Sequence, residues 1–341
     1  MAPPTTLLVA THELCWKHDP GPGHPERPDR LSAVKHGLDT SPVADGITWV
    51  EATEAPDEVI TAIHDGAFIE RLDRLSAAGG GQIDPDTYVS AHSSAAARVA
   101  AGAGLDLIAR LDRGEGTAGW SMVRPPGHHA TRNQQMGFCL YNNIAVAARA
   151  LADRGERVAI IDIDAHHGNG TQDVFYDDPR VLFVSFHQFP WYPYTGRPDE
   201  IGTGAGEHAT VNVALPAGTT GEVYRAGVER LLAPVMADFE PTWLLISAGF
   251  DGHRDDPITD LGLTSADYAD LVADLLGFVE PGRRLLFLEG GYDLLALSHS
   301  AAAVAAAVLG EREHPERPTS GGPGLDAVTT AERIHVRDRL T

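Results

Sequence analysis

The chain has 341 residues and a formal net charge of −22. This charge excludes binding to nucleic-acid phosphates through a basic surface, and it favours cationic substrates unless it serves only solubility. No apolar stretch approaches the ~20 residues of a membrane span, and the opening residues do not resemble a signal peptide. Two cysteines, Cys15 and Cys139, give no disulfide framework. We therefore expect a cytoplasmic protein without a membrane partner.

Predicted strands and helices alternate along the chain. In the first half, strands are expected at 7–10 and 120–123, and helices from about 30, over 56–76, from 90 or 92 to 112, and over 142–154. In the second half, strands from 158 and at 180–186, 243–246 and 284–288 alternate with helices over 222–239, 264–278 and 293–310. Such alternation is typical of a parallel sheet covered by helices on both faces. We expect one domain over 1–310, and a polar extension over 311–341 that wraps the surface or frays.

The stretch from Val158 to Gly170, VAIIDIDAHHGNG, changes within one residue from an apolar strand to a polar cluster. Residues two apart in an extended chain point the same way, so Asp162, Asp164 and His166 share one side of the strand end. Carboxylates and imidazoles at this spacing are good ligands for a first-row metal. A lone Asp-x-Asp would more often be a solvated loop or a helix cap. The two histidines that follow favour a metal site.

A third metal ligand has to come from another strand end, because this stretch supplies two. Asp251, in Ser-Ala-Gly-Phe-Asp after the strand at 243–246, is the natural candidate. Asp164, His166 and Asp251 would bind zinc and leave a fourth position open. By itself, Asp251 would more often be a helix cap or a solvated acid.

Two further strand ends carry side chains suited to acid–base chemistry. His128 and His129 follow Pro125-Pro126-Gly127, and near a metal such a pair serves as ligands or as a base and an acid toward a water. Tyr292 follows a Gly-Gly pair, and its hydroxyl could stabilise an oxyanion. Taken singly, each histidine is better explained as a hydrogen-bonded loop residue. Packing under the next helix explains Tyr292 equally well.

Together these motifs resemble those of the zinc-dependent histone deacetylase family, which includes the acetylpolyamine amidohydrolases. The matching segments, in the family's order, are HPERPDRL (24–31), RPPGHHA (124–130), GFCLYNN (137–143), DIDAHHGNGTQDVFY (162–176), SAGFD (247–251) and LEGGYD (288–293). The form with Asn169 in place of an Asp looks most like class II and bacterial members. The resemblance implies an arginase-like three-layer α/β/α sandwich around an eight-stranded, mostly parallel sheet.

The resemblance implies hydrolysis of N-acetyl amides of lysine side chains, or of similar amines, to acetate and a free amine. It places zinc at Asp164, His166 and Asp251, the same ligands that the residues alone suggest. The family also binds potassium beside the zinc, through side-chain or main-chain oxygens of Asp162, Asp164, His166, Ser185 and Phe186.

The resemblance also implies roles for the neighbouring polar residues. His129 would be the general base and then acid, and His128 its electrostatic neighbour. Asp162 would orient His128, and Asn169 would orient His129. An Asn cannot stabilise an imidazolium by charge, so His129 is expected to be the less basic of the pair. Tyr292 would hold the oxyanion.

Four residues would line the tunnel that holds the acyl-amine chain: Gly137, Phe138, Tyr192 and Ile258. Tyr192 stands where the family usually has Phe, which adds a hydroxyl near the rim. Polyamine-selective relatives carry an acidic residue at the position of Ile258. The sequence therefore favours lysine-like or less polar substrates.

Two other functions stay open at this point. An acetylpolyamine amidohydrolase would use the same site, and the negative charge of the chain suits a polyamine. A catalytically silent module that binds acyl-lysine would be signalled by loss of Tyr292 or of a zinc ligand, and this chain retains them. The sequence does not name the physiological substrate, and it allows a homo-oligomer.

Overall fold

The structure, a computed structural model, describes residues 5–312 and 315–337. Its main strands are β1 Leu7–Thr11, β2 Ile47–Glu51, β5 Ala118–Ser121, β6 Val158–Asp162, β7 Val181–Gln188, β8 Thr210–Leu215, β9 Trp243–Ala248 and β10 Arg284–Leu288. They form one eight-stranded sheet in the order β2-β1-β5-β10-β9-β6-β7-β8, and each pairing within it is parallel. This is the α/β fold that the sequence predicted.

The central strands are apolar because both faces of the sheet are covered. Every residue of β6 (VAIID) and of β9 (WLLISA) is buried. A strand covered on one face alone would alternate apolar and polar residues, whereas these runs are almost continuously apolar. The continuous apolar sequence of these strands is therefore a consequence of helix layers on both faces of the sheet.

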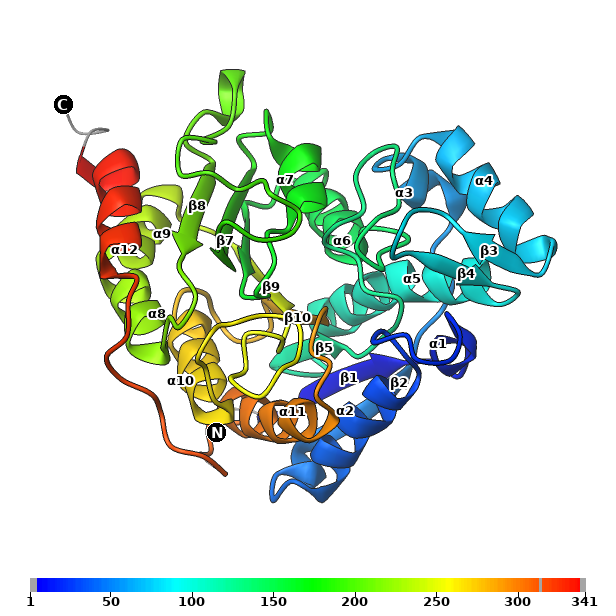
Figure 1. The fold of residues 1–341 in the computed structure, drawn as a ribbon, viewed down its shortest axis with the longest axis horizontal. Helices are drawn as coiled ribbons and strands as arrows, with labels where there is room; N and C mark the ends of the chain where they lie inside the picture. Colours follow the sequence, from blue (N-terminus) through cyan, green and yellow to red (C-terminus); the bar gives the residue numbers. More distant parts are fainter. Residues whose placement is uncertain (1–4, 313–314, 338–341) are drawn as a thin grey trace.

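Helices form a layer on each side of this sheet (Figure 1). On one side α11 Leu294–Val308 packs against both α2 Asp29–Thr40 and α10 Ser265–Leu276. On the other side α5 Ser93–Asp112 and α6 Asn143–Ala152 pack together and contact the strands. The Gly and Ala of α5 allow a close approach: a Cβ on Gly104 would lie 2.8 Å from the Phe287 ring. Side-chain caps at Asn142 and Thr264 mark the first turns of α6 and α10.

Two predicted helices are wrong as single α-helices. The span 56–76 holds α3 Asp57–Thr61 and α4 Gly66–Ala77. Between them the backbone N–H of Asp65 donates to the carbonyl of Arg132 rather than to the preceding turn. The span 222–239 holds α8 Gly221–Gly227, a π-helical turn Val228–Leu232 and α9 Ala233–Phe239. Pro234 has no N–H for the carbonyl four residues earlier, which favours the wider turn before it.

The two edge strands were missed, and the predicted strand at 120–123 lies two residues earlier, at β5. In β2 (ITWVE) just one of five residues is buried, so it lacks the apolar run of a central strand. β8 follows a long loop rich in Pro and Gly, which obscured where regular structure resumes. A small hairpin of β3 Gly80–Gln82 and β4 Tyr88–Ser90 was also missed.

The segment after α11 folds back onto the domain where it is described. Its residues Leu325–Glu332 form α12, which packs against β8 and α8 and lies at the edge of Figure 1. Earlier in the segment, the Glu316 carboxylate accepts hydrogen bonds from Ser265 and from Arg254. The segment therefore wraps the surface and includes a helix that was not expected. Residues 313–314 and 338–341 lie outside the described part, and the division at residue 310 stays a prediction.

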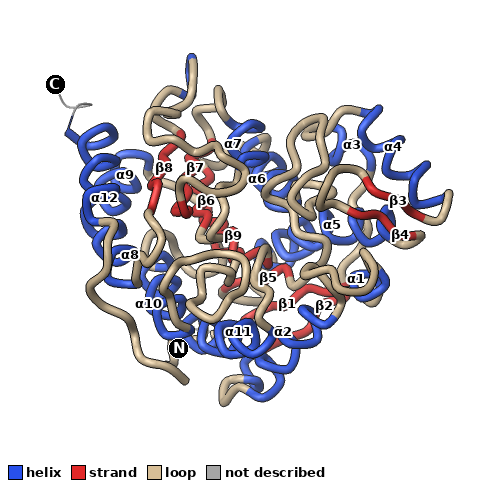
Figure 2. The backbone as a smooth tube through the Cα atoms, in the orientation of Figure 1, coloured by secondary structure: helices blue, strands red, loops and turns tan. Residues whose placement is uncertain are grey.

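Long loops, tan in Figure 2, gather over the middle of the sheet. They follow the carboxyl ends of β5, β6, β7, β9 and β10 and include residues 122–142, 163–168, 189–203, 249–264 and 289–293. In open parallel sheets this edge is where ligands bind. In the part of the chain that the structure describes, no helix is both long and apolar enough to cross a membrane.

Candidate active site

The four strand ends that carry the predicted polar motifs belong to neighbouring strands. β5, β10, β9 and β6 are adjacent in the sheet, in that order. Their parallel direction places the loops after them at one edge. Residues that are far apart in sequence, such as His129, Asp164, Asp251 and Tyr292, are thereby brought into one site.

Asp164, His166 and Asp251 form a buried cluster whose ligand atoms all lie within 4.8 Å of one another. His166 Nδ1 lies 3.1 Å from Asp164 Oδ1 and 3.0 Å from Asp251 Oδ2. Backbone groups orient the carboxylates: Ala165 N–H donates to Asp251 at 2.8 Å, and Gly290 N–H donates to Asp164 at 2.8 Å. Three ligand groups therefore converge on one point before any ion is considered.

The chemistry of this cluster fits a divalent cation. Burial and then the charge of Asp164 raise the pKa of Asp251, because two carboxylates are held together away from water. A bound cation offsets that cost, which a buried pair of like charges otherwise carries. The glycines beside the cluster make room for it: a Cβ on Gly249 would lie 1.9 Å from Asp164 Oδ2, and one on Gly290 would lie 2.1 Å from Asp251 Oδ2.

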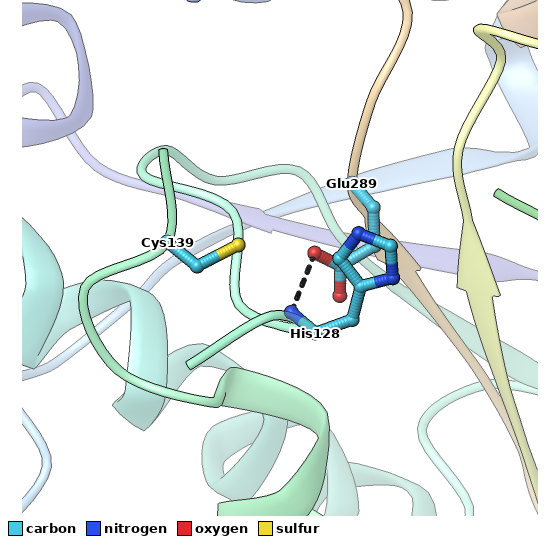
Figure 3. Close-up of side chains that lie close together, drawn as sticks. All are labelled: His128, Cys139 and Glu289. Atoms are coloured by element: carbon cyan, nitrogen blue, oxygen red, sulfur yellow. Dashed lines mark hydrogen bonds between the residues drawn. The ribbon is translucent and has the colours of Figure 1, made fainter. Parts of the chain in front are cut away.

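A second buried group, His128, Cys139 and Glu289, also has ligand atoms within 4.8 Å of one another (Figure 3). Glu289 Oε2 already accepts the backbone N–H groups of Gly127 at 2.7 Å and His128 at 3.1 Å. Burial raises the pKa of the Cys139 thiol well above its usual range, although a thiol binds metal as the thiolate. This group is therefore poorly suited to a metal. Glu289 instead holds the backbone at Gly127 and His128, where the chain enters the histidine pair.

His128 and His129 lie side by side, with ring centroids 4.0 Å apart, but their environments differ. His128 Nδ1 donates to Asp162 Oδ2 at 2.9 Å, whereas His129 Nδ1 donates to the amide oxygen of Asn169 at 2.8 Å. Burial alone would lower the pKa of His128, but the carboxylates of Asp164 and Asp162 raise it to about 10. Burial and then the charges of His128 and His166 hold the pKa of His129 well below its usual range. His129 is thus the neutral member of the pair.

A cavity of about 330 Å³ opens above these groups. The four predicted tunnel residues line it together with His129, His166 and Tyr292. The ring of Tyr192 meets that of His129 edge-on at 5.4 Å, and the ring of Phe138 meets that of Tyr292 at 5.7 Å. Burial raises the pKa of the Tyr292 phenol well above its usual range, so it remains a hydrogen-bond donor at neutral pH.

Gly137 and Phe138 turn the chain into the cavity through unusual backbone angles. Gly137 has φ 55°, and a Cβ there would lie 2.4 Å from the His129 ring, so glycine is required. Phe138 has φ 67°, an uncommon value for a residue with a side chain. Thr87 Oγ1 accepts the N–H of Phe138 at 3.1 Å and helps to hold this turn.

Three cavity residues were missed in the sequence: Asp86, Trp191 and Tyr194. Trp191 and Tyr194 lie in the loop 189–203 after β7, and the aromatic, Pro and Gly residues of that loop were the available signal. Trp191 Nε1 donates to the carbonyl of Ile258 at 3.2 Å. Asp86 lies in an Asp-Pro-Asp-Thr turn whose sequence indicates a loop and nothing about its position. Of the residues proposed for potassium, Asp162 of β6 pairs with Ser185 of β7, and Phe186 follows Ser185. Asp164 and His166 lie in the loop after β6.

The comparisons with known proteins agree with this architecture. Residues 24–308 match the histone deacetylase domain, so the chain belongs to the histone deacetylase family. It is 39% identical over 309 residues to a probable deacetylase of Archaeoglobus fulgidus, which covers 89% of this chain and 86% of that protein. It is also 39% identical over 313 residues to histone deacetylase 15 of Arabidopsis thaliana, covering 90% of this chain and 56% of that protein. A crystal structure of the HDA15 HD domain superposes with a TM-score of 0.90 at 36% identity, over 98% of this chain and 95% of the other.

Proposed function

We propose that the protein is a zinc-dependent deacetylase that hydrolyses N-acetyl amides of lysine side chains, or of similar amines, to acetate and the free amine. The observation that carries this proposal is the convergence of Asp164, His166 and Asp251 beside the cavity that His129 and Tyr292 also line. Three ligands and an open side are the arrangement of a catalytic zinc site, whereas structural sites are closed by a fourth ligand.

Each protein group has a distinct task in this reaction. Zinc held by the three ligands would polarise the amide carbonyl and acidify the attacking water. His129 accepts the proton of that water through Nε2, because its Nδ1–H is engaged by Asn169. The same histidine then returns a proton to the leaving amine. Tyr292 donates its hydroxyl hydrogen to the oxyanion, which develops as the carbonyl carbon becomes tetrahedral.

Replacing Tyr292 with Phe tests the catalytic role of the cavity. The Tyr292→Phe protein should bind zinc normally and turn over an acetyl-lysine peptide ~10²–10³-fold more slowly, since loss of one oxyanion donor typically has that effect. The measurement is kcat on the peptide, with zinc content and the unfolding temperature as controls. Turnover within about threefold of the wild type would contradict the role of the hydroxyl.

The substrate class depends on the mouth of the cavity. Ile258 lines it and offers no charge to a distal ammonium group, which favours lysine-like substrates over polyamines. The net charge of −22 and the carboxylate of Asp86 in the same lining favour a polyamine. We propose acetyl-lysine or a similar amide as the main substrate and acetylpolyamines as the alternative.

Replacing Ile258 with Glu should raise catalytic efficiency on an acetylated polyamine relative to an acetyl-lysine peptide. An ion pair at a partly exposed position contributes about 1 kcal/mol, which corresponds to a shift of about fivefold in the ratio. The ratio of the two efficiencies is measured at low and moderate salt, because screening should reduce the effect. Ile258→Gln, of similar size and without charge, is the matched control.

An unchanged ratio in the Ile258→Glu protein would show that this position does not face the distal end of the substrate. A wild type that already prefers polyamines would show that another acid makes the selection. In that case Asp86→Asn is the next variant, since its carboxylate lines the same cavity.

The silent-module alternative predicts acyl-lysine binding without turnover by zinc-loaded protein. A screen of acetyl-lysine peptides, trifluoroacetyl-lysine and acetylated polyamines separates it from both enzymatic functions. A potassium ion held by oxygens of Asp162, Asp164, His166, Ser185 and Phe186, and a cytoplasmic location, stay predictions.

A further inference from the structure

Asp256 is a buried carboxylate that links the metal-ligand loop to the segment carrying Tyr292. It lies five residues after Asp251, and 6% of its surface is exposed. Burial and then the negative charge of Asp251 raise its pKa to about 7. A charge in this position carries a desolvation cost that a neutral side chain would avoid. The hydrogen bonds that Asp256 accepts indicate its role.

Three backbone N–H groups donate to the two oxygens of Asp256. The N–H of Tyr292 donates to Oδ2 at 2.6 Å, and that of Asp293 donates to the same oxygen at 3.3 Å. The N–H of Ile258 donates to Oδ1 at 3.1 Å. One carboxylate thus accepts hydrogen bonds from the backbone of two residues that line the cavity, Tyr292 and Ile258.

Arg30 donates hydrogen bonds to the backbone carbonyl groups of the same segment. Its Nε donates to the carbonyl of Gly291 at 2.5 Å, and its Nη2 donates to the carbonyl of Glu289 at 2.6 Å. The guanidinium carbon lies 4.8 Å from the centre of the Tyr292 ring. The segment 289–293 is therefore held by Arg30 through its carbonyls and by Asp256 through its N–H groups.

We infer that Asp256 is a positioning residue, which sets the Tyr292 hydroxyl relative to the metal ligands by fixing the Tyr292 backbone. This inference rests on the proposed function, because it acts through the oxyanion role of Tyr292. Both carboxylate oxygens are needed: an asparagine has one acceptor oxygen, and its NH₂ group would face an N–H group. A small displacement of a catalytic group is costly, since a shift of ~1 Å can reduce the rate ~10²-fold.

The experiment combines Asp256→Asn with Tyr292→Phe in a double-mutant cycle. Asp256→Asn should lower kcat on an acetyl-lysine peptide at least tenfold, with KM within about twofold and zinc content unchanged. In the Tyr292→Phe background the same substitution should lower kcat by less than about threefold, because the hydroxyl that Asp256 positions is absent. The matched control is Asp255→Asn, which removes the neighbouring, exposed carboxylate and should retain wild-type kcat.

Amide hydrogen exchange supplies a readout that does not depend on turnover. The peptide containing Gly291 to Asp293 should exchange faster in Asp256→Asn than in Asp255→Asn. If Asp256→Asn does not fold, Asp256→Glu replaces it, since that change keeps both oxygens and moves them by one methylene. Asp256→Glu should show the same pattern, with a smaller loss of kcat.

Two outcomes would overturn the inference alone. One is an active wild type with equal kcat in Asp256→Asn and Asp255→Asn. The other is a loss from Asp256→Asn that is as large in the Tyr292→Phe background as in the wild-type background, which is the result of a general structural defect. A wild type without turnover on any acetylated amine would instead overturn the proposed function, and this inference with it.

Discussion

Replacing Asp251 with alanine is expected to remove zinc from the protein and to abolish deacetylation. The cluster supplies three ligand groups, and two would remain, which is fewer than a catalytic zinc site uses. Metal analysis of the purified protein gives the direct measurement, with activity on an acetyl-lysine peptide as the second. One zinc per chain in the Asp251→Ala protein would contradict the ligand assignment.

Loss of metal has to be separated from loss of fold in this experiment. Asp251 Oδ1 accepts the backbone N–H of Ala165, so alanine also leaves a buried donor unpaired. Asp251→Asn can keep that hydrogen bond while it removes the charge of the ligand. It should fold with near wild-type stability and bind zinc much more weakly. The exposed Asp255 provides the control for removal of a carboxylate from the same loop.

Replacing His129 with alanine should reduce turnover more severely than replacing His128. His129 is expected to carry the proton from water to the leaving amine, and general acid–base catalysis contributes typically 10²–10⁴-fold. Its low pKa leaves it neutral and able to accept a proton at pH 7. The carboxylates of Asp164 and Asp162 raise the pKa of His128, which makes it the poorer candidate for the first proton acceptor.

The measurement for the histidine pair is kcat for both variants on the same peptide, with zinc content as the control. The kcat of His129→Ala should fall at least ~10²-fold, which is the lower end of the contribution of a general base. His128→Ala should lose less, because its contribution is electrostatic. Equal losses, or the reverse order, would show that the two roles are exchanged.

Local sequence predicted the candidate metal ligands that directly follow single strands. Alternation in an extended chain predicted that Asp162, Asp164 and His166 share one side. In the structure β6 ends at Asp162, and Asp164 and His166 lie in the loop that follows it. Apolar runs identified the central strands because burial on both faces leaves a local signal. Asp251 was predicted as the third ligand because a metal site needs one and it follows another strand, and the structure places it beside Asp164 and His166.

Tertiary structure decided which segments meet. The neighbouring positions of β5, β10, β9 and β6 bring His129, Tyr292 and Asp251 beside Asp164, and no local pattern specifies that order. In the sequence analysis, the resemblance to a known family implied that these residues share one site, without giving the strand order. Edge strands and α12 escaped prediction because their burial depends on distant partners.

The residues found only in the structure share one physical feature. Asp86 reaches the cavity from the turn between β3 and β4, and Asp256 reaches Tyr292 from the loop after β9. Loops have no periodicity, so their sequence shows where a turn occurs but not what it contacts. The sequence by itself determined the central strands through their burial, and its Asp-x-Asp-x-His spacing predicts a metal site. The tertiary structure decided how the cavity is lined and how its tyrosine is held, because those contacts join segments far apart in the chain.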